Sequence, residues 1–285
     1  MIEIGDIRIH LINDGRVLVD GGGPFGLVPR VLWGEIIPPV RENLIPMTLV
    51  CLLVQVDGQN IVVDTGYGHK DDKRLERIVH LERPQGDLLD GLARLGVAPG
   101  EVDLVIDTHL HYDHAGGNTY LDSDGNLQPT FPNAEYVVQR REYEDAMQPN
   151  ERTRATYLPA NYAPLAESGQ MRLLDGDTEL LPGIRGVVTP GHTPGHMSVT
   201  FQRGGQAAMF VCDLASYAVH FARLGWMTAY DVEPLVTLET KRGWQQWALE
   251  NDALLIFPHD PSLHVGRLVN TGKRPHIEPI ESTFA

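Results

Sequence analysis

Apolar and polar residues alternate along several short stretches of the chain, and this period of two predicts β-strands. Residues 2–13 alternate through Ile7, Ile9 and Leu11, as a half-buried strand does. Two apolar runs between 48 and 66 are joined by Asp57-Gly58, a pair that favours a tight hairpin turn. Further strands are expected at 102–106, 135–138, 184–189, 198–202, 207–212 and 253–257.

Helical spacing is clearest in residues 87–96, where Leu88, Leu92 and Leu95 recur on one face and Gly96 provides a natural end. Two further helices are expected near 140–147 and 238–250. Residues 20–47 combine many glycines and prolines with large apolar side chains, which predicts a long apolar loop. No low-complexity tract or linker interrupts the chain. We therefore expect one α/β domain spanning residues 1–285.

Two segments resemble each other internally. Residues 54–64 (VQVDGQNIVVD) and 201–213 (FQRGGQAAMFVCD) both read as strand, glycine turn, strand and then aspartate. The similarity indicates either a duplicated architecture or a coincidence between two common hairpins, and the sequence alone leaves both open.

The amino-acid composition and net charge of the chain limit the kinds of molecule that it is expected to bind. The chain has 285 residues, 42% hydrophobic and 21% charged, as in an ordinary soluble globular protein. Its net charge of -15 disfavours nucleic acid and anionic membrane surfaces as partners. The N-terminus lacks the basic and apolar regions of a signal peptide, and Cys51 and Cys212 lie in apolar runs, as buried thiols do. We expect a cytoplasmic protein.

Candidate metal ligands are most concentrated in HLHYDH at 109–114. This segment places three of the 12 histidines and one aspartate within six positions. A lone histidine is usually structural, but four candidate ligands in six residues favour a metal site. In an extended segment His109 and His111 project to the same side and reach one point. Once the backbone turns towards a helix, Asp113 and His114 face a neighbouring point. The segment thus predicts parts of two adjacent metal positions.

Additional ligands are expected where other apolar runs end. His192 ends GVVTPGH, Asp213 ends AAMFVCD and His259 ends ALLIFPHD. An aspartate after a mostly apolar run would be costly to bury without a partner. These three side chains are therefore candidates to complete the site.

The order HLHYDH, PGHTPGH, strand-final Asp and strand-final His resembles the metallo-beta-lactamase superfamily over residues 48–260. The resemblance implies a four-layer αββα sandwich built from two similar halves. It implies two divalent metal ions per chain, zinc foremost, with cobalt, manganese or iron as alternatives. Carried over by position, it implies one ion held by His109, His111 and His192, a second held by Asp113, His114 and His259, and Asp213 bridging them.

The same resemblance suggests a function and further roles. Asp113 would orient the attacking hydroxide and pass its proton to the leaving group. Asp64 and His196 are expected to support the ligands. Among branches of the superfamily, the chain is most similar to N-acyl homoserine lactonases and methyl parathion hydrolases. In the lactonases a tyrosine lies three residues after the bridging aspartate. Here Ser216 takes that position, and the next residue, Tyr217, either donates to the developing oxyanion or only packs.

We expect a dinuclear metal-dependent hydrolase, a quorum-quenching lactonase that opens N-acyl homoserine lactones or related rings. The alternatives are a phosphotriesterase or arylesterase, and a non-hydrolytic protein with one iron ion. The substrate is expected to be small, uncharged and partly apolar, and a homodimer is left open. The loop 20–47 and residues 220–231 would wall the pocket, with candidate substrate contacts, or packing residues, at Phe25, Trp33, Phe221, Trp226 and Met227.

Overall fold

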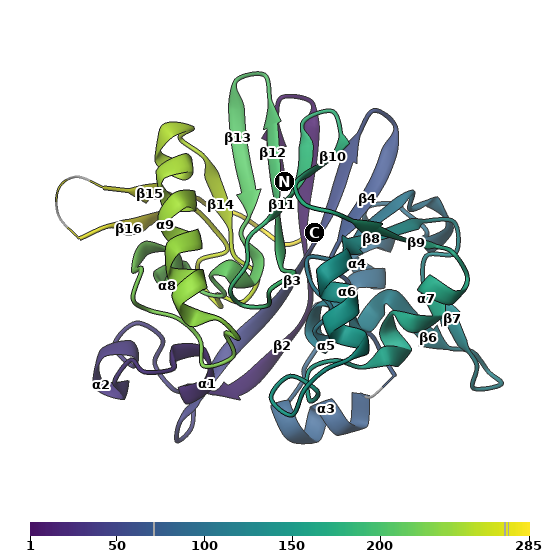
Figure 1. The fold of residues 1–285 in the computed structure, drawn as a ribbon, viewed down its shortest axis with the longest axis horizontal. Helices are drawn as coiled ribbons and strands as arrows, with labels where there is room; N and C mark the ends of the chain where they lie inside the picture. The colour runs from purple at the N-terminus through teal and green to yellow at the C-terminus, as the bar shows by residue number, and fades with distance from the viewer. Residues whose placement is uncertain (71, 271, 273) are drawn as a thin grey trace.

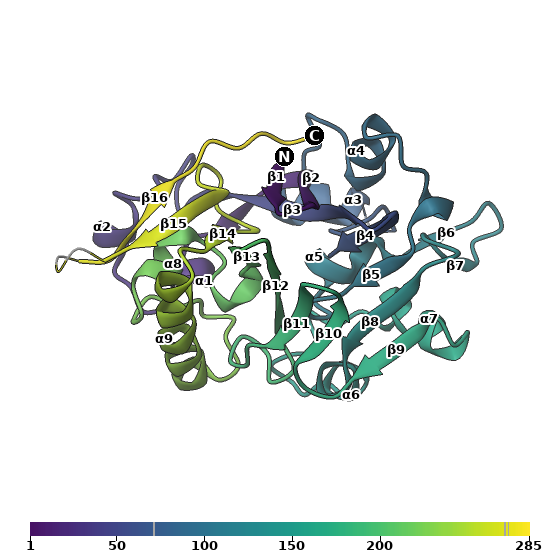
Figure 2. The ribbon, with the colours of Figure 1, turned by 90° about the horizontal axis from the view of Figure 1, so that it is seen from above.

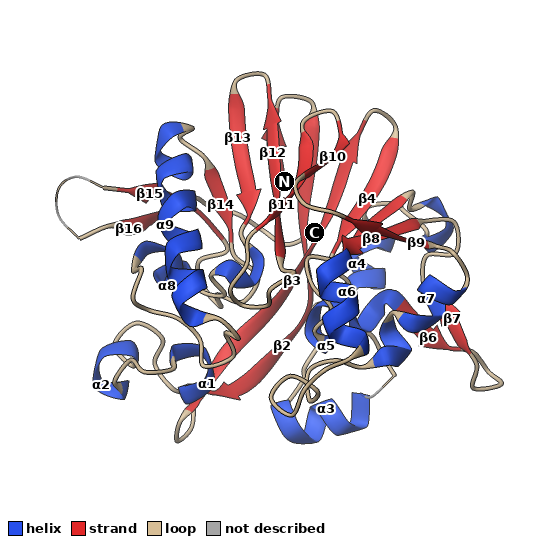
Figure 3. Cartoon of the chain, in the orientation of Figure 1, coloured by secondary structure: helices blue, strands red, loops and turns tan. Residues whose placement is uncertain are grey.

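The computed structural model describes residues 1–70, 72–270, 272 and 274–285. The strands form two large mixed sheets and one small hairpin (Figures 1 and 3). The first sheet has the order β1 (Ile2–Ile4), β2 (Ile7–Asp20), β3 (Leu44–Val56), β4 (Gln59–Val63), β5 (Leu104–Ile106), β8 (Glu135–Gln139) and β9 (Met171–Leu174). The second has the order β10 (Thr178–Leu181), β11 (Ile184–Val188), β12 (Met197–Arg203), β13 (Gln206–Phe210), β14 (Leu254–Ile256), β15 (Val265–Val269) and β16 (His276–Pro279). The hairpin pairs β6 (Thr119–Leu121) with β7 (Leu127–Pro129).

Helices cover the outer side of each sheet (Figure 2). Those of the first half are α3 (Asp72–Val79), α4 (Leu88–Arg94), α5 (Tyr112–Ala115), α6 (Arg140–Met147) and α7 (Ala163–Glu167). Those of the second half are α8 (Ala218–Ala222) and α9 (Pro234–Glu250), and single helical turns α1 (Gly22–Phe25) and α2 (Arg30–Trp33) lie between β2 and β3. Short 3-10 turns are η1 (Pro99–Glu101), η2 (Gly116–Asn118), η3 (Pro159–Asn161) and η4 (Cys212–Leu214).

The layers follow from the alternation of side chains along the strands. In β3, Leu52 and Val54 face a core that both sheets share, and they meet Phe201 of β12 there. The intervening Leu53 faces outward into a second core with Leu92 of α4. A third core joins the outer face of the second sheet to α8 and α9, through Met209, Leu255, Phe257, Phe221 and Ala248. These cores separate helix, sheet, sheet and helix, which confirms the predicted four-layer αββα sandwich.

The two segments that resemble each other in sequence have the same topology. β3 and β4 form a hairpin, and β4 then pairs with β5 in parallel. β12 and β13 form the equivalent hairpin, and β13 pairs with β14 in parallel. Each hairpin turns at paired residues with positive φ, Asp57-Gly58 and Gly204-Gly205. The sequence similarity therefore coincides with equivalent elements in the two halves.

The loop expected at 20–47 is shorter than predicted. β2 continues to Asp20 across a register shift between Asn13 and Arg16, and β3 already begins at Leu44. Strands β9, β10, β15 and β16 were not predicted, because each is only four or five residues long and its burial is mixed. Within the described residues, no helix has the length and hydrophobicity needed to cross a membrane.

Candidate metal centre

The candidate ligands gather at one end of the two sheets, where strands stop and loops begin. The first half supplies them from the segment after β5 and from α5, and the second half from the segments after β11, β13 and β14. The buried ones are His109, His111, His114, His192, Asp213 and His259, and Asp113 is half-buried. The structure thus brings together all seven side chains named from the sequence.

One group of ligand atoms is centred on His111. Its Nδ1 lies 3.1 Å from His109 Nε2 and 3.1 Å from His192 Nε2. A tetrahedral zinc ion with nitrogen ligands at about 2.0–2.1 Å holds those nitrogens roughly 3.3–3.4 Å apart. The spacing of these three ring nitrogens therefore fits one zinc-sized ion.

A second group lies beside the first. His114 Nε2 and His259 Nε2 are 3.2 Å apart, and Asp113 Oδ2 lies 3.7 Å from the former and 3.8 Å from the latter. Asp213 faces both groups with different oxygens. Its Oδ2 is 3.2 Å from His192 Nε2, and its Oδ1 is 3.1 Å from His259 Nε2. Asp213 therefore lies between the two groups, with one oxygen close to a histidine of each.

Hydrogen bonds behind the rings orient their free nitrogens. His114 Nδ1 donates to Asp64 Oδ2 at 2.9 Å, and His259 Nδ1 donates to the Thr48 carbonyl at 2.8 Å. His192 Nδ1 likewise donates to Asp231 Oδ1 at 3.0 Å. Carboxylate and carbonyl oxygens only accept, so each Nδ1 carries the hydrogen and each Nε2 presents a lone pair to the centre. Converging lone pairs beside a carboxylate repel one another unless a cation lies between them, so this donor set fits metal ions.

The electrostatics differ from ligand to ligand. Burial opposes the charged form of both His192 and His114, yet Asp213 raises the pKa of His192, and Cys212 and Asp113 raise that of His114. Metal binding at these two rings would therefore displace a proton. Burial lowers the pKa values of His109 and His111 well below the usual range, which keeps both rings neutral. Burial alone would raise the pKa of Asp213, but His259, His192 and His114 hold it well below its usual range. Asp213 is therefore ionised, the form in which a carboxylate binds a cation.

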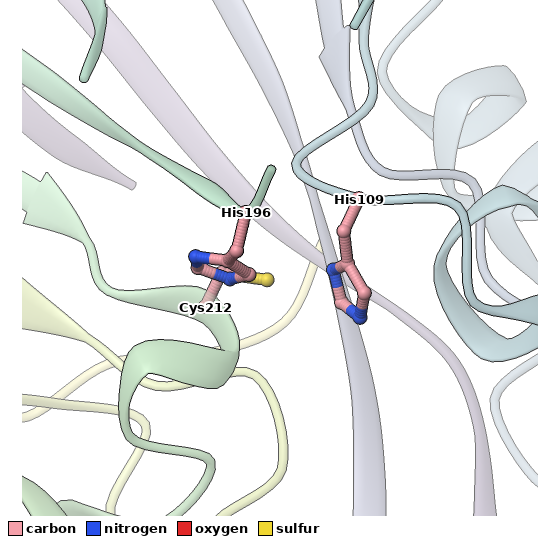
Figure 4. A group of neighbouring side chains, drawn as sticks. All are labelled: His109, His196 and Cys212. Carbon is pink, nitrogen blue, oxygen red and sulfur yellow. The ribbon is translucent and has the colours of Figure 1, made fainter. Parts of the chain in front are cut away.

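His196 and Cys212 lie next to His109 across the boundary between the halves (Figure 4). The amide of Asp213 donates to His196 Nε2 at 3.1 Å, and burial lowers the pKa of His196 to about 3, so its ring stays neutral. Cys212 has a φ of 51° and its Sγ lies 3.0 Å from Thr108 Oγ1. His196 therefore accepts a hydrogen bond from the backbone of Asp213, which agrees with the supporting role expected for it. Asp64 supports a different ligand, because it accepts a hydrogen bond from the ring of His114.

Glu142 fixes two of the ligand-bearing segments from α6. Its Oε1 accepts from the Leu110 amide at 3.0 Å and from the Tyr157 hydroxyl at 2.9 Å, and its Oε2 accepts from Thr193 Oγ1. Leu110 lies between two ligands and Thr193 follows another. One buried carboxylate therefore sets the relative position of loops from both halves.

Comparison with known proteins agrees with this arrangement. Residues 46–262 match the family model described as the metallo-beta-lactamase superfamily. The chain belongs to this superfamily.

Individual relatives cover most of the chain. An N-acyl homoserine lactonase from Bacillus cereus is 28% identical in an alignment of 236 positions that covers 76% of this chain and 83% of that protein. A probable metal-dependent hydrolase from Staphylococcus aureus has a solved structure with a TM-score of 0.88 and 29% identity, covering 99% of this chain and 100% of that one. AidC, a dizinc quorum-quenching lactonase, shares the fold with a TM-score of 0.78 at 19% identity, covering 99% of this chain and 97% of its own.

The metallo-beta-lactamase centre of this chain opens into a cavity of about 460 Å³. His111, Asp113, His192, Asp213 and His259 form part of its lining. One wall is apolar, with Leu18, Leu44, Met47, Ile78 and Val79, and Asp20, Arg152 and Tyr230 contribute polar groups. A mostly apolar cavity with few polar groups is typical of a small-molecule site.

The residues predicted as substrate contacts lie elsewhere, which corrects that prediction. Phe25, Trp33 and Phe221 are buried in the core, and Phe25 stacks on Trp33 with ring centroids 5.2 Å apart. Trp226 packs against the Arg223 guanidinium, 4.2 Å from its ring centroid, and Met227 does not line the cavity either. The aromatic residues support α1 and the 226–231 loop from behind, because their large apolar surfaces are more stable in a core than in a wet cavity.

The hydroxyl of Tyr217 already has a hydrogen-bond partner within the protein. Tyr217 is fully buried, its hydroxyl donates to the Pro46 carbonyl at 3.2 Å, and burial raises its pKa well above the usual range. Ser216, at the position of the lactonase tyrosine, donates instead to Asp213 Oδ1 at 3.0 Å. Tyr217 also belongs to the cavity lining, so its bond to Pro46 favours the packing role, while the oxyanion role stays a prediction.

Several important residues were missed by sequence reasoning. Asp231 and Thr48 hold ligand rings although each lies far from its partner in the chain. Glu142 sits in a charged helix, where a glutamate is expected to be exposed, and Tyr230 lies in a loop. No local pattern marks these residues, because their roles arise only from contacts between distant segments.

Proposed function

We propose that the chain is a dinuclear metal-dependent hydrolase that opens lactone rings, with N-acyl homoserine lactones as its substrates. The observation that carries this proposal is the pair of ligand groups that share Asp213, with ring nitrogens 3.1 and 3.2 Å apart. His109, His111 and His192 would hold one ion, and Asp113, His114 and His259 the other. The named activity of the Bacillus cereus lactonase supports the substrate class.

Two divalent ions in such a site supply Lewis-acid chemistry, which makes water nucleophilic at neutral pH and polarises a carbonyl oxygen. The side chains around the site then orient the reacting groups and shape the cavity for the substrate. Asp113 lines the cavity next to both His114 and His259, so its carboxylate can accept a proton from the attacking water and return it to the leaving alkoxide. Ser216 keeps Asp213 in register through its hydrogen bond. The apolar wall suits an uncharged acyl lactone.

The first test is metal content together with hydrolysis. Purified protein supplied with zinc should bind about two ions per chain by elemental analysis, and His111→Ala should lose metal and hydrolysis together. His276→Ala is the matched control, because His276 is an exposed residue of β16 outside the cavity. One tightly held iron with oxygen consumption would contradict the proposal and support the mononuclear iron alternative.

A substrate panel then separates the hydrolase classes. N-acyl homoserine lactones, alkyl lactones, aryl esters and a paraoxon-type triester should rank with the acyl homoserine lactones highest in kcat/KM. A preference for the triester would replace the lactonase assignment by the phosphotriesterase alternative.

The role of Asp113 needs a separate variant. Asp113→Asn keeps an oxygen for metal binding but cannot carry the proton, so kcat should fall by about 100-fold or more, with a smaller change in KM. Unchanged kcat in a fully metal-loaded variant would remove Asp113 from proton transfer.

A further inference from the structure

The loop between α8 and α9 lies directly on α1 and forms part of the cavity wall (Figure 1). The Ala229 amide donates to the Gly23 carbonyl at 2.8 Å, which fixes the loop against the helical turn. The side chain of Tyr230 then crosses Gly23. A Cβ atom added at Gly23 would lie 1.8 Å from the Tyr230 hydroxyl, so glycine at this position is what makes room for that oxygen.

The Tyr230 hydroxyl has no partner among the described residues. Two other tyrosines close to the centre have hydroxyls that are engaged: Tyr157 donates to Glu142, and Tyr217 donates to Pro46. The rings of Tyr67 and Tyr112 pack on each other, with centroids 5.2 Å apart. A phenol has an ordinary pKa of about 10, so the Tyr230 oxygen keeps its proton at neutral pH. Tyr230 therefore offers the cavity an uncommitted hydrogen-bond donor.

Arg152 is the other strong donor at this end of the cavity, and it is already used. Its Nη2 donates to the Ala229 carbonyl at 2.8 Å and to the Asp231 carbonyl at 2.9 Å. These bonds brace the backbone on both sides of Tyr230. Arg152 thus holds the loop in place, whereas Tyr230 lines the cavity with a hydroxyl that has no partner among the described residues.

Tyr230 lies at the mouth of the cavity and not on its floor. It is 47% exposed, whereas His111 and Asp213 are each only 6% exposed. A hydroxyl at the mouth reaches a part of the substrate that is remote from the reacting carbonyl. The apolar wall of Leu18, Met47 and Ile78 lies in the same cavity and suits an alkyl chain.

We propose that the Tyr230 hydroxyl donates a hydrogen bond to the amide carbonyl of an N-acyl lactone and so selects acylamino lactones over lactones without an amide. The inference rests on the proposed lactonase function. Tyr230 is a specificity-determining residue in this assignment, and the ring-opening step does not pass through it.

The test compares Tyr230→Phe with the parent on N-hexanoyl homoserine lactone and on an alkyl γ-lactone of similar length. Loss of one neutral hydrogen bond should lower kcat/KM for the acylamino lactone by about fivefold, mainly through KM, and leave the alkyl lactone unchanged. Gly23→Ala should show the same selectivity, because the new methyl group displaces the hydroxyl but keeps it in the protein. Tyr120→Phe is the control, since Tyr120 is 45% exposed on β6 and outside this cavity.

Each outcome is decisive once melting temperatures show that the variants are folded. Equal losses on both lactones would place the hydroxyl at the reacting carbonyl or in the structure and overturn the inference. No loss on either would overturn it too, while the proposed function would stand. If the metal-loaded parent hydrolyses neither lactone, the proposed function fails and the inference fails with it.

Discussion

Replacement of Asp64 by asparagine should selectively weaken the second metal position. Asp64 Oδ2 accepts from His114 Nδ1 at 2.9 Å, and Oδ1 accepts from the Thr108 amide at 2.9 Å. The residue has a φ of 56°, a conformation that asparagine tolerates well, so the backbone should be preserved. Because the Thr108 amide would keep the single oxygen of the new side chain, its NH2 group would turn towards His114 Nδ1.

That change would reverse the tautomer of His114. Nδ1 would become the acceptor, and the hydrogen would move to Nε2, where a metal ion should bind. Loss of such a supporting partner costs about 10- to 100-fold in metal affinity, or roughly 1.4–2.7 kcal/mol. The group around His111 does not contact Asp64, so the first ion should be retained.

Competition with a chromogenic chelator measures the metal affinity of both positions. In Asp64→Asn it should show one site per chain with weakened affinity and one with the parental affinity. Asp107→Asn is the matched control, because Asp107 is a buried aspartate nearby whose carboxyl contacts Asn118 and no histidine ring among the described residues. Two ions of parental affinity in Asp64→Asn, or equal weakening in both variants, would refute the reasoning.

Three further changes test other parts of the structure. Tyr217→Phe should cost about 1 kcal/mol of stability through its lost bond to Pro46 and leave kcat unchanged, whereas a fall on the order of 100-fold would identify it as an oxyanion donor. Burial lowers the pKa of Lys241 from 10.5 to about 7. Between these two pH values Lys241 is protonated in the unfolded chain and deprotonated in the folded chain, so the free energy of unfolding rises with pH. From pH 7 to pH 9 this gain is about 2 kcal/mol in chemical denaturation, and Lys241→Met should lack it; parallel curves would contradict the shift. Gly117→Ala should destabilise by about 1–3 kcal/mol, because its Cβ would lie 2.2 Å from the Thr65 carbonyl oxygen. Gly243→Ala, in open space on α9, should stabilise by up to about 1 kcal/mol in the same denaturation assay, and equal effects would count against the packing argument.

The sequence predicted the centre far better than the cavity around it. HLHYDH is a local motif, and ligands such as His192 and His259 follow apolar runs that are recognisable as strands. The wall of the cavity depends instead on how α1, the end of β2 and the 226–231 loop pack together. Phe25 and Trp33 were assigned to the cavity because they are large and apolar, but the same property places them in the core.

The short strands and the contacts that support the ligands could not be predicted from the sequence either. β15 and β16 pair with each other across residues 265–279 with only four or five residues each, too few for a clear period of two. Asp231 supports His192 across 39 positions of the chain, and no spacing rule connects them. Such partners are determined by tertiary packing, so only a structure reveals them.

The division of the ligands between the two halves has a consequence for the whole molecule. In the proposed centre, each metal position would take two residues from the loops of the first sheet and one from the loops of the second sheet, so a bound ion would link the two halves. Each ion that binds only the folded chain would add about 2.7 kcal/mol to its stability when its free concentration is 100 times its dissociation constant. On this proposal the free energy of unfolding would depend on the metal concentration around the protein, and loss of metal would weaken the contact between the two halves at the active site.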